Sequence, residues 1–169
     1  MKILGLNAYE LTSSVAIIED GHVLFAECEE RLSRIKRHKC FPSLALEAGL
    51  SETNFSIPDF DAISLGWNPG VLANKVNDTL GIRPRELYFF KLFEEVASRA
   101  KRGEHFGDWT MIRSAEPNVP DIYFVRHHIS HAANAIYQSP FKTGDFLTLD
   151  FKGEIETGTY GRFNGKEML

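Results

Sequence analysis

The first 30 residues contain three apolar, β-rich runs separated by short polar turns, and this pattern constrains the fold more than any other feature of the chain. The runs are KILGLNA at 2–8, SVAIIED at 14–20 and VLFAECEE at 23–30. Asp20-Gly21 at the second junction is a hairpin signal, while the polar loop YELTSS joins the first two runs. The chain is therefore expected to open with a three-stranded meander.

A similar order of elements returns near the other end of the chain. FLTLDF at 146–151, ETGTYGRF at 156–163, the turn Asn164-Gly165 and the short run KEML follow one another there. Two such meanders predict a duplicated protein, with a first lobe over residues 1–144 and the opening strands of a truncated second lobe over 145–169. The simpler alternative is that KEML forms only a short edge strand.

Helical and strand-like segments alternate between the two meanders, which favours the α/β class. SLALEAGL follows Pro42 and is predicted to be a short helix that ends at Gly49. DAISLGW at 61–67 has the pattern of a buried strand, and an amphipathic helix is predicted from Pro84 to Gly103. We expect residues 104–120, which contain Gly, Pro, Asn and Asp, to form a long connection.

Composition limits the partners that the chain can have. With 43% hydrophobic and 25% charged residues it resembles an ordinary globular domain, and its net charge of −4 argues against a nucleic-acid partner. Cys28 and Cys40 lack a disulfide or CxxC spacing and are expected to be reduced thiols of a cytoplasmic protein. The apolar start is too short and too polar to span a membrane, so we expect no membrane partner.

The segment RHHISHAANAIY places three histidines at the start of a predicted helix. His127 and His131 are four residues apart and can share one helix face, while Asp150 ends the strand-like run FLTLD. Two imidazoles and one carboxylate can together hold a divalent metal. The alternative is a hydrogen-bonded surface pair without a metal. His128 would point elsewhere, to contact substrate or to cap the helix.

Two loops in equivalent places of the suspected repeat are candidates for phosphate contacts. YELTSS offers the hydroxyls of Ser13 and Ser14, and DFKGE offers the backbone around Gly153. Arg31 and Lys36 closely follow the third strand and are candidate anion ligands. These patterns are also compatible with ordinary hairpin turns and a solvated charged surface.

Three segments of this chain, taken in order, resemble the amino-terminal region of the O-carbamoyltransferases of nodulation-factor and antibiotic biosynthesis. They are MKILGLNAYELTSSVAIIEDGHVLFAECEERLSRIKRHKCFP, RHHISHAANAIYQSPF and LTLDFKGE. The pattern EER-x-[ST]-R-x-K, the element HHxxHAA and a following D-x-x-GE are specific as a set. The resemblance is weakest at about residues 70–120.

This resemblance implies a duplicated actin-like (ribonuclease H-like) ATPase fold in a protein roughly three times longer. In that family, ATP and carbamoyl phosphate give carbamoyl adenylate, and the carbamoyl group passes to a substrate hydroxyl. The histidines and aspartate that match His127, His131 and Asp150 hold a metal, usually taken as iron. The implied partners are carbamoyl phosphate, ATP, a hydroxyl acceptor and the missing remainder of the protein, without which the fragment is expected to be inactive.

The chain departs from the family pattern at two loops. ELTSS, with Glu10 and Thr12, replaces a His-Asp-Ser-Ser sequence, and Phe151 replaces the glycine that usually follows the strand-end aspartate. Two other functions stay open. One is a threonylcarbamoyl-transfer relative that acts on tRNA, and the other is a non-catalytic actin-like interaction module, with which 13 phenylalanines are compatible.

Overall fold

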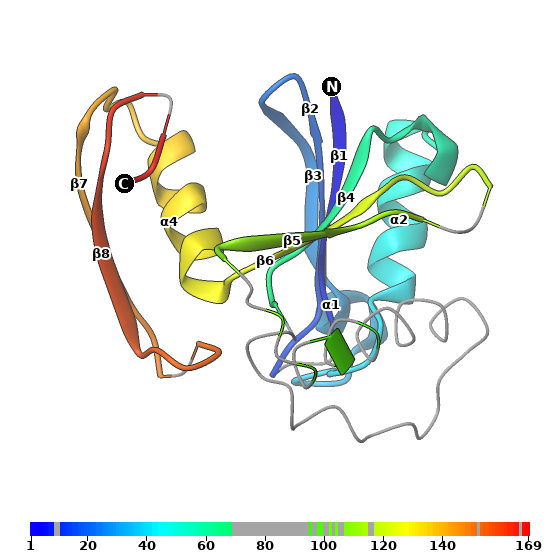
Figure 1. Cartoon of the computed structure of the whole chain (residues 1–169). Coiled ribbons are helices and arrows are strands. Elements are labelled where there is room, and N and C mark those ends of the chain that lie inside the picture. Colours follow the sequence, from blue (N-terminus) through cyan, green and yellow to red (C-terminus); the bar gives the residue numbers. More distant parts are fainter. Residues whose placement is uncertain are drawn as a thin grey trace.

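The computed structural model describes residues 1–8, 11–68, 95, 98–99, 102, 104, 107–114, 117–151, 153–165 and 167–169. It combines a six-stranded mixed sheet with a separate two-stranded sheet and a few helices (Figure 1). The strand order in the larger sheet is β3-β2-β1-β4-β6-β5. The predicted α/β class is confirmed.

The expected meander opens the larger sheet. Its strands are β1 (Lys2–Asn7), β2 (Ser14–Glu19) and β3 (His22–Cys28), and each neighbouring pair is antiparallel. Asp20 and Gly21 both have positive φ at the β2–β3 turn. A two-residue hairpin turn of this twist requires positive φ at both positions, and aspartate and glycine adopt such values more readily than most residues.

Parallel strands extend the sheet on the other side of β1. The strand β4 (Ala62–Leu65) pairs with β1, and β6 (Ile122–Val125) pairs with β4, both in parallel. The carboxyl ends of β1, β4 and β6 therefore share one edge, where open α/β sheets commonly bind ligands. In Figure 1, β1 runs downward from the N-terminus, and β6 ends beside the start of α4.

The predicted long connection over residues 104–120 is wrong in part, because it contains β5 (Trp109–Ile112). This strand pairs antiparallel with β6, from Trp109 opposite Val125 to Ile112 opposite Ile122. The run WTMI is short but rich in residues that favour strands, and Ile112 is buried in the core. Because this edge strand has only four residues and polar residues flank it, the apolar pattern was too short to predict it.

The main core lies between the larger sheet and α2 (Ser43–Thr53). Alternate residues of the central strands are buried: Leu4, Leu6, Val15, Ile17, Ile63, Leu65, Ile122 and Phe124. The predicted end of α2 at Gly49 is wrong, because the helix continues to Thr53 and closes at Asn54, whose φ is 56°. A Cβ at Gly49 would lie 2.8 Å from the Phe25 ring, so this glycine allows the helix to approach the sheet closely.

Two short helical segments complete this part of the chain. They are α1 (Glu29–Ser33), which directly follows β3, and the 3-10 helix η1 (Ile57–Asp59). The Glu29 carboxylate is buried and accepts hydrogen bonds from the backbone N–H groups of Leu44 and Ala45 at the start of α2. The EER sequence is thus anchored by its first glutamate.

The second sheet packs on a helix of its own. It is formed by β7 (Gly144–Leu149) and β8 (Gly158–Phe163), and α4 (His127–Tyr137) covers one face of it (Figure 1). Ala132 and Ile136 of α4 pack with Phe163 in a small second core. Beyond β8, Met168 forms a bridge with Phe163, so the KEML run begins to pair with the hairpin as expected.

The helix predicted from Pro84 to Gly103 lies largely outside the described residues, which include only Glu95, Ser98, Arg99 and Arg102 from that range. Over the described part of the chain, no helix is long and apolar enough to cross a membrane. Cys28 and Cys40 are free thiols.

Candidate metal centre

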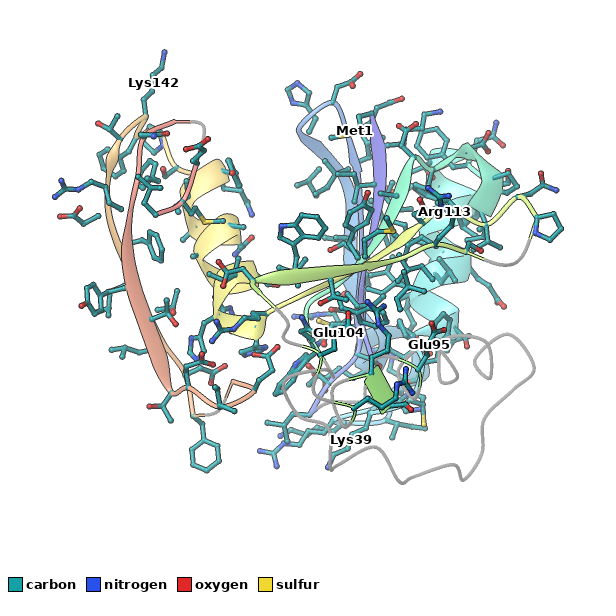
Figure 2. The ribbon with its side chains drawn as sticks, in the orientation of Figure 1. Met1, Lys39, Glu95, Glu104, Arg113 and Lys142 are labelled. Carbon is teal, nitrogen blue, oxygen red and sulfur yellow. The ribbon has the colours of Figure 1, made fainter. Side chains whose placement is uncertain are left out.

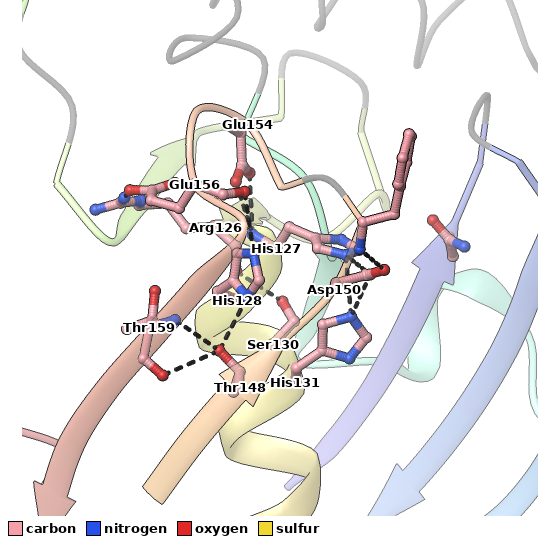
Figure 3. Close-up of polar contacts among 12 residues, drawn as sticks. Arg126, His127, His128, Ser130, His131, Thr148, Asp150, Glu154, Glu156 and Thr159 are labelled. Atoms are coloured by element: carbon pink, nitrogen blue, oxygen red, sulfur yellow. Dashed lines mark hydrogen bonds and ion pairs between the residues drawn. The ribbon is translucent and has the colours of Figure 1, made fainter.

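The three predicted metal ligands come from two elements that meet at the carboxyl edge of the larger sheet. The helix α4 begins one residue after β6, and its first residue is His127. His131 lies one helical turn later and therefore projects on the same side of α4. Asp150 is the first residue after β7 and faces both imidazoles (Figure 3).

The ligand atoms form a tight triangle. His127 Nε2 lies 2.9 Å from Asp150 Oδ2 and 2.9 Å from His131 Nε2. The third side, from His131 Nε2 to Asp150 Oδ2, measures 3.2 Å. These three residues are the one group of histidine, cysteine and acidic side chains with metal-site spacing within the residues that the structure describes.

The triangle has the size and the chemistry that a divalent cation requires. Metal–ligand bonds of about 2.1 Å place neighbouring donors about 3.0 Å apart in an octahedral shell and about 3.4 Å apart in a tetrahedral one. The observed sides of 2.9, 2.9 and 3.2 Å are short enough for the three atoms to share one cation, and without a cation the same distances are hydrogen bonds between these groups. Two imidazoles and one carboxylate form a donor set that several divalent transition metals accept.

The centre is partly open to solvent. The exposed fractions of the side chains are 19% for His127, 49% for His131 and 39% for Asp150. Hydrogen bonds from His127, from the backbone N–H of Phe151 and from His131 lower the pKa of Asp150 to about 2. The carboxylate is thus ionised at neutral pH and available as a ligand. The Phe151 side chain is 89% exposed.

His128 does not join the triangle but links α4 to the second sheet. It is 2% exposed, its Nδ1 lies 2.9 Å from Thr148 Oγ1, and its Nε2 lies 3.2 Å from the backbone carbonyl oxygen of Glu156 (Figure 3). The predicted phosphate-contact residue Gly153 packs against this ring, and a Cβ there would lie 2.5 Å from His128 Cδ2. The contacts of both residues are therefore with the protein interior.

The other predicted anion ligands lie outside the triangle. The Ser13 hydroxyl is buried and donates a hydrogen bond to the His38 carbonyl oxygen, and Ser14 is the first residue of β2. Arg31 pairs with Glu27 at 3.5 Å, and Lys36 is exposed. The basic segment 31–39 starts in α1, which lies in the lower half of Figure 1. Its last residue, Lys39, lies at the lower end of Figure 2, and Met1 lies at the upper end.

The sequence model of the carbamoyltransferase N-terminus family matches residues 2–169 of this chain. The chain belongs to this family. Two curated relatives of this carbamoyltransferase segment are the uncharacterized protein sll1178 of Synechocystis, at 30% identity, and the nodulation protein NolNO of Sinorhizobium fredii, at 26% identity. The alignments cover 98% and 96% of this chain but only 28% and 22% of these relatives, so the chain spans a minor part of their length.

Two residues of this carbamoyltransferase segment that the sequence analysis did not single out support the first histidine. The Trp67 ring lies 4.9 Å from the His127 ring, centroid to centroid, and is 7% exposed. The Glu154 carboxylate is 3% exposed and accepts the backbone N–H of His127. The D-x-x-GE element was a signal for Glu154, whereas the sequence held no signal that the Trp67 ring would contact a histidine.

Proposed function

We propose that this chain is the N-terminal part of an O-carbamoyltransferase, which transfers a carbamoyl group from carbamoyl adenylate to a substrate hydroxyl. The family match over residues 2–169 is the observation that carries the proposal. Carbamoyl adenylate would be made from carbamoyl phosphate and ATP by the remainder of a longer protein, and this fragment alone would be inactive. The printed name of one relative, a nodulation protein, is compatible with such a role.

In this proposal His127, His131 and Asp150 hold a divalent cation, with iron as the expected metal. Their donor set and spacing support the assignment. When bound, the cation would supply positive charge next to a nucleotide phosphate and so favour its departure. His127 and His131 must be neutral to act as ligands. Asp150, whose carboxyl group is ionised at neutral pH, would contribute a negative charge.

The remaining candidate residues would bind the anionic part of the substrate. Arg31 and Lys36 would make the electrostatic potential at the carboxyl edge of the sheet more positive and so attract phosphate oxygens. The loop that contains Ser13 and Ser14 would approach the nucleotide with its backbone, because the Ser13 hydroxyl is buried and bonded to the His38 carbonyl oxygen. Gly153 would act indirectly, because its N–H is bonded to the Glu156 carbonyl oxygen and it packs on the His128 ring.

We further propose an actin-like ATPase fold with a first lobe over residues 1–144 and a second lobe that begins within 145–169. The antiparallel opening strands β1–β3 and the separate hairpin β7–β8 with its Met168 bridge support the duplication. The helix α4 shares its core with the second hairpin, so it would join the two lobes. A cytoplasmic location is part of the same proposal and rests on the two free cysteines.

Calorimetric titration of the metal-loaded chain with AMP, the leaving group of carbamoyl adenylate, tests the nucleotide part of this function. We expect binding that depends on the metal. It should weaken in Asp150→Asn, which removes a ligand of the cation, and at least severalfold in Lys36→Ala, which removes a positive charge near the phosphate. Lys39→Ala is the matched control in the same basic segment, and its affinity should equal that of the parent. Metal-loaded chain that fails to bind AMP, or equal losses for both lysines, would contradict the proposal.

A further inference from the structure

We propose that Glu154 is a positioning residue for the metal centre, acting through backbone N–H groups rather than as a ligand. The inference rests on the proposed metal site and names the residue that sets its geometry. Glu154 lies four residues after Asp150 in the loop between β7 and β8, so it belongs to the same loop as the carboxylate ligand.

The Glu154 carboxylate is buried and fully engaged with backbone donors. Oε1 accepts the N–H of Asn68 at 2.8 Å and the N–H of His127 at 3.0 Å. Oε2 accepts the same His127 N–H at 3.1 Å. A carboxylate that is 3% exposed is stable only when such donors replace water, so these contacts are the reason that a charged residue is tolerated here.

These contacts connect the three chain segments that surround the metal centre. Asn68 follows β4 and comes directly after Trp67, whose ring contacts the His127 ring at a tilted angle. His127 is the first residue of α4, and Glu154 belongs to the loop whose first residue is Asp150. One side chain thus fixes the distance between a histidine ligand and the carboxylate ligand.

The start of α4 also explains why a glutamate performs this task. Its N-cap residue, Arg126, makes no side-chain capping hydrogen bond, so the first N–H of the helix has no local acceptor. Glu154 supplies that acceptor from the hairpin loop, with a negative charge at the positive end of the helix dipole. The capping group of the helix and the metal-ligand loop are therefore one structural unit.

A second buried glutamate provides a matched control within the same chain. Glu29 is 2% exposed and accepts the N–H groups of Leu44 at 3.1 Å and Ala45 at 2.8 Å at the start of α2. It performs the same local task as Glu154, but no candidate metal ligand lies on α2. Removal of either glutamate should weaken folding, whereas only the loss of Glu154 should disturb the metal centre.

The test is a titration of the metal-free chain with Co²⁺, followed by the visible absorption bands of the bound ion. We expect Glu154→Ala to weaken Co²⁺ binding about 10–100-fold and to alter the bands, as other outer-shell substitutions do at metal sites. Glu154→Gln keeps an acceptor oxygen and should stay within about threefold of the parent, and so should Glu29→Ala, because it is independent of the site. Equal affinities for Glu154→Ala and the parent, or equal losses for both alanine variants, would overturn the inference.

A variant that fails to fold does not end the test. If Glu154→Ala is unfolded, Glu154→Asp takes its place, because its shorter side chain cannot reach both N–H groups, and an affinity equal to that of the parent would overturn the inference. Failure of the metal site itself gives a different result. In that case the parent gives the same Co²⁺ spectrum as the double variant His127→Ala, His131→Ala. Both proposals then fall together.

Discussion

Neighbouring histidines of α4 should respond in opposite ways to truncation. His128→Ala should destabilise the metal-free chain and leave Co²⁺ affinity within about tenfold of the parent. His131→Ala should leave the stability almost unchanged and remove most of the Co²⁺ affinity. The reason is that His128 is buried in the contact between α4 and the second sheet, whereas His131 is half exposed and its Nε2 is hydrogen-bonded to His127 and Asp150.

The magnitude for His128 follows from its contacts. Substitution by alanine removes the hydrogen bonds to Thr148 Oγ1 and to the Glu156 carbonyl oxygen and leaves a cavity the size of an imidazole ring. Thr148 keeps its contacts with the backbone of Thr159, so its hydroxyl does not lose every partner. The free energy of unfolding should therefore fall by about 2–4 kcal/mol, in the middle of the range for buried truncations. For His131→Ala we expect a change within about 0.5 kcal/mol, which is usual for exposed positions.

Urea denaturation in the presence of a chelator, followed by far-ultraviolet circular dichroism, gives the two stabilities without a contribution from bound metal. A Co²⁺ titration of the same samples gives the two affinities. The reasoning would be refuted if His131→Ala destabilised the metal-free chain as much as His128→Ala does. It would also be refuted if His128→Ala abolished Co²⁺ binding while the chain stayed folded.

Three further results are expected. Gly153→Ala should destabilise the chain by about 1–3 kcal/mol in urea denaturation, because the new Cβ would overlap the His128 ring, whereas Gly107→Ala, with open space around its Cα, should be neutral; equal effects would contradict the packing account. Asp150 has its pKa lowered from 3.8 to about 2, so its contribution to the stability of the metal-free chain is present above pH 4 and is lost as the pH falls towards 2. Acid titrations of the parent and Asp150→Asn should diverge in that window, and parallel curves would disprove it. Co²⁺ should quench the fluorescence of Trp67, whose ring centroid lies 4.9 Å from that of His127, and quenching that persists in a Trp67→Phe variant would refute this assignment.

The parts of the fold that were predicted from the sequence depend on local periodicity. The opening meander follows from period-two apolar runs and the Asp20-Gly21 turn, both of which are short-range signals. The approach of His127 to His131 follows from their spacing on a helix, and the place of Asp150 follows from its position at a strand end. For these residues the backbone geometry alone determines which side chains can meet.

The parts that were not predicted depend on tertiary contacts. The strand β5 has four residues between polar segments and is stabilised by pairing with β6, so periodicity over so short a run could not identify it. Gly49 has the sequence signature of a helix end but serves the close approach of α2 to Phe25. The burial of Glu154 depends on donors contributed by Asn68 and His127, which are far from it in sequence. No local pattern contains that information.

The measurement that tests the central claim most directly is the metal content of the purified chain, compared with that of His127→Ala combined with His131→Ala. His22→Ala, on strand β3, serves as the histidine control. The account predicts close to one equivalent of iron or another divalent metal in the parent and in the control, and none in the double variant. Metal that persists in the double variant, or a parent that takes up none when iron is supplied, would contradict it.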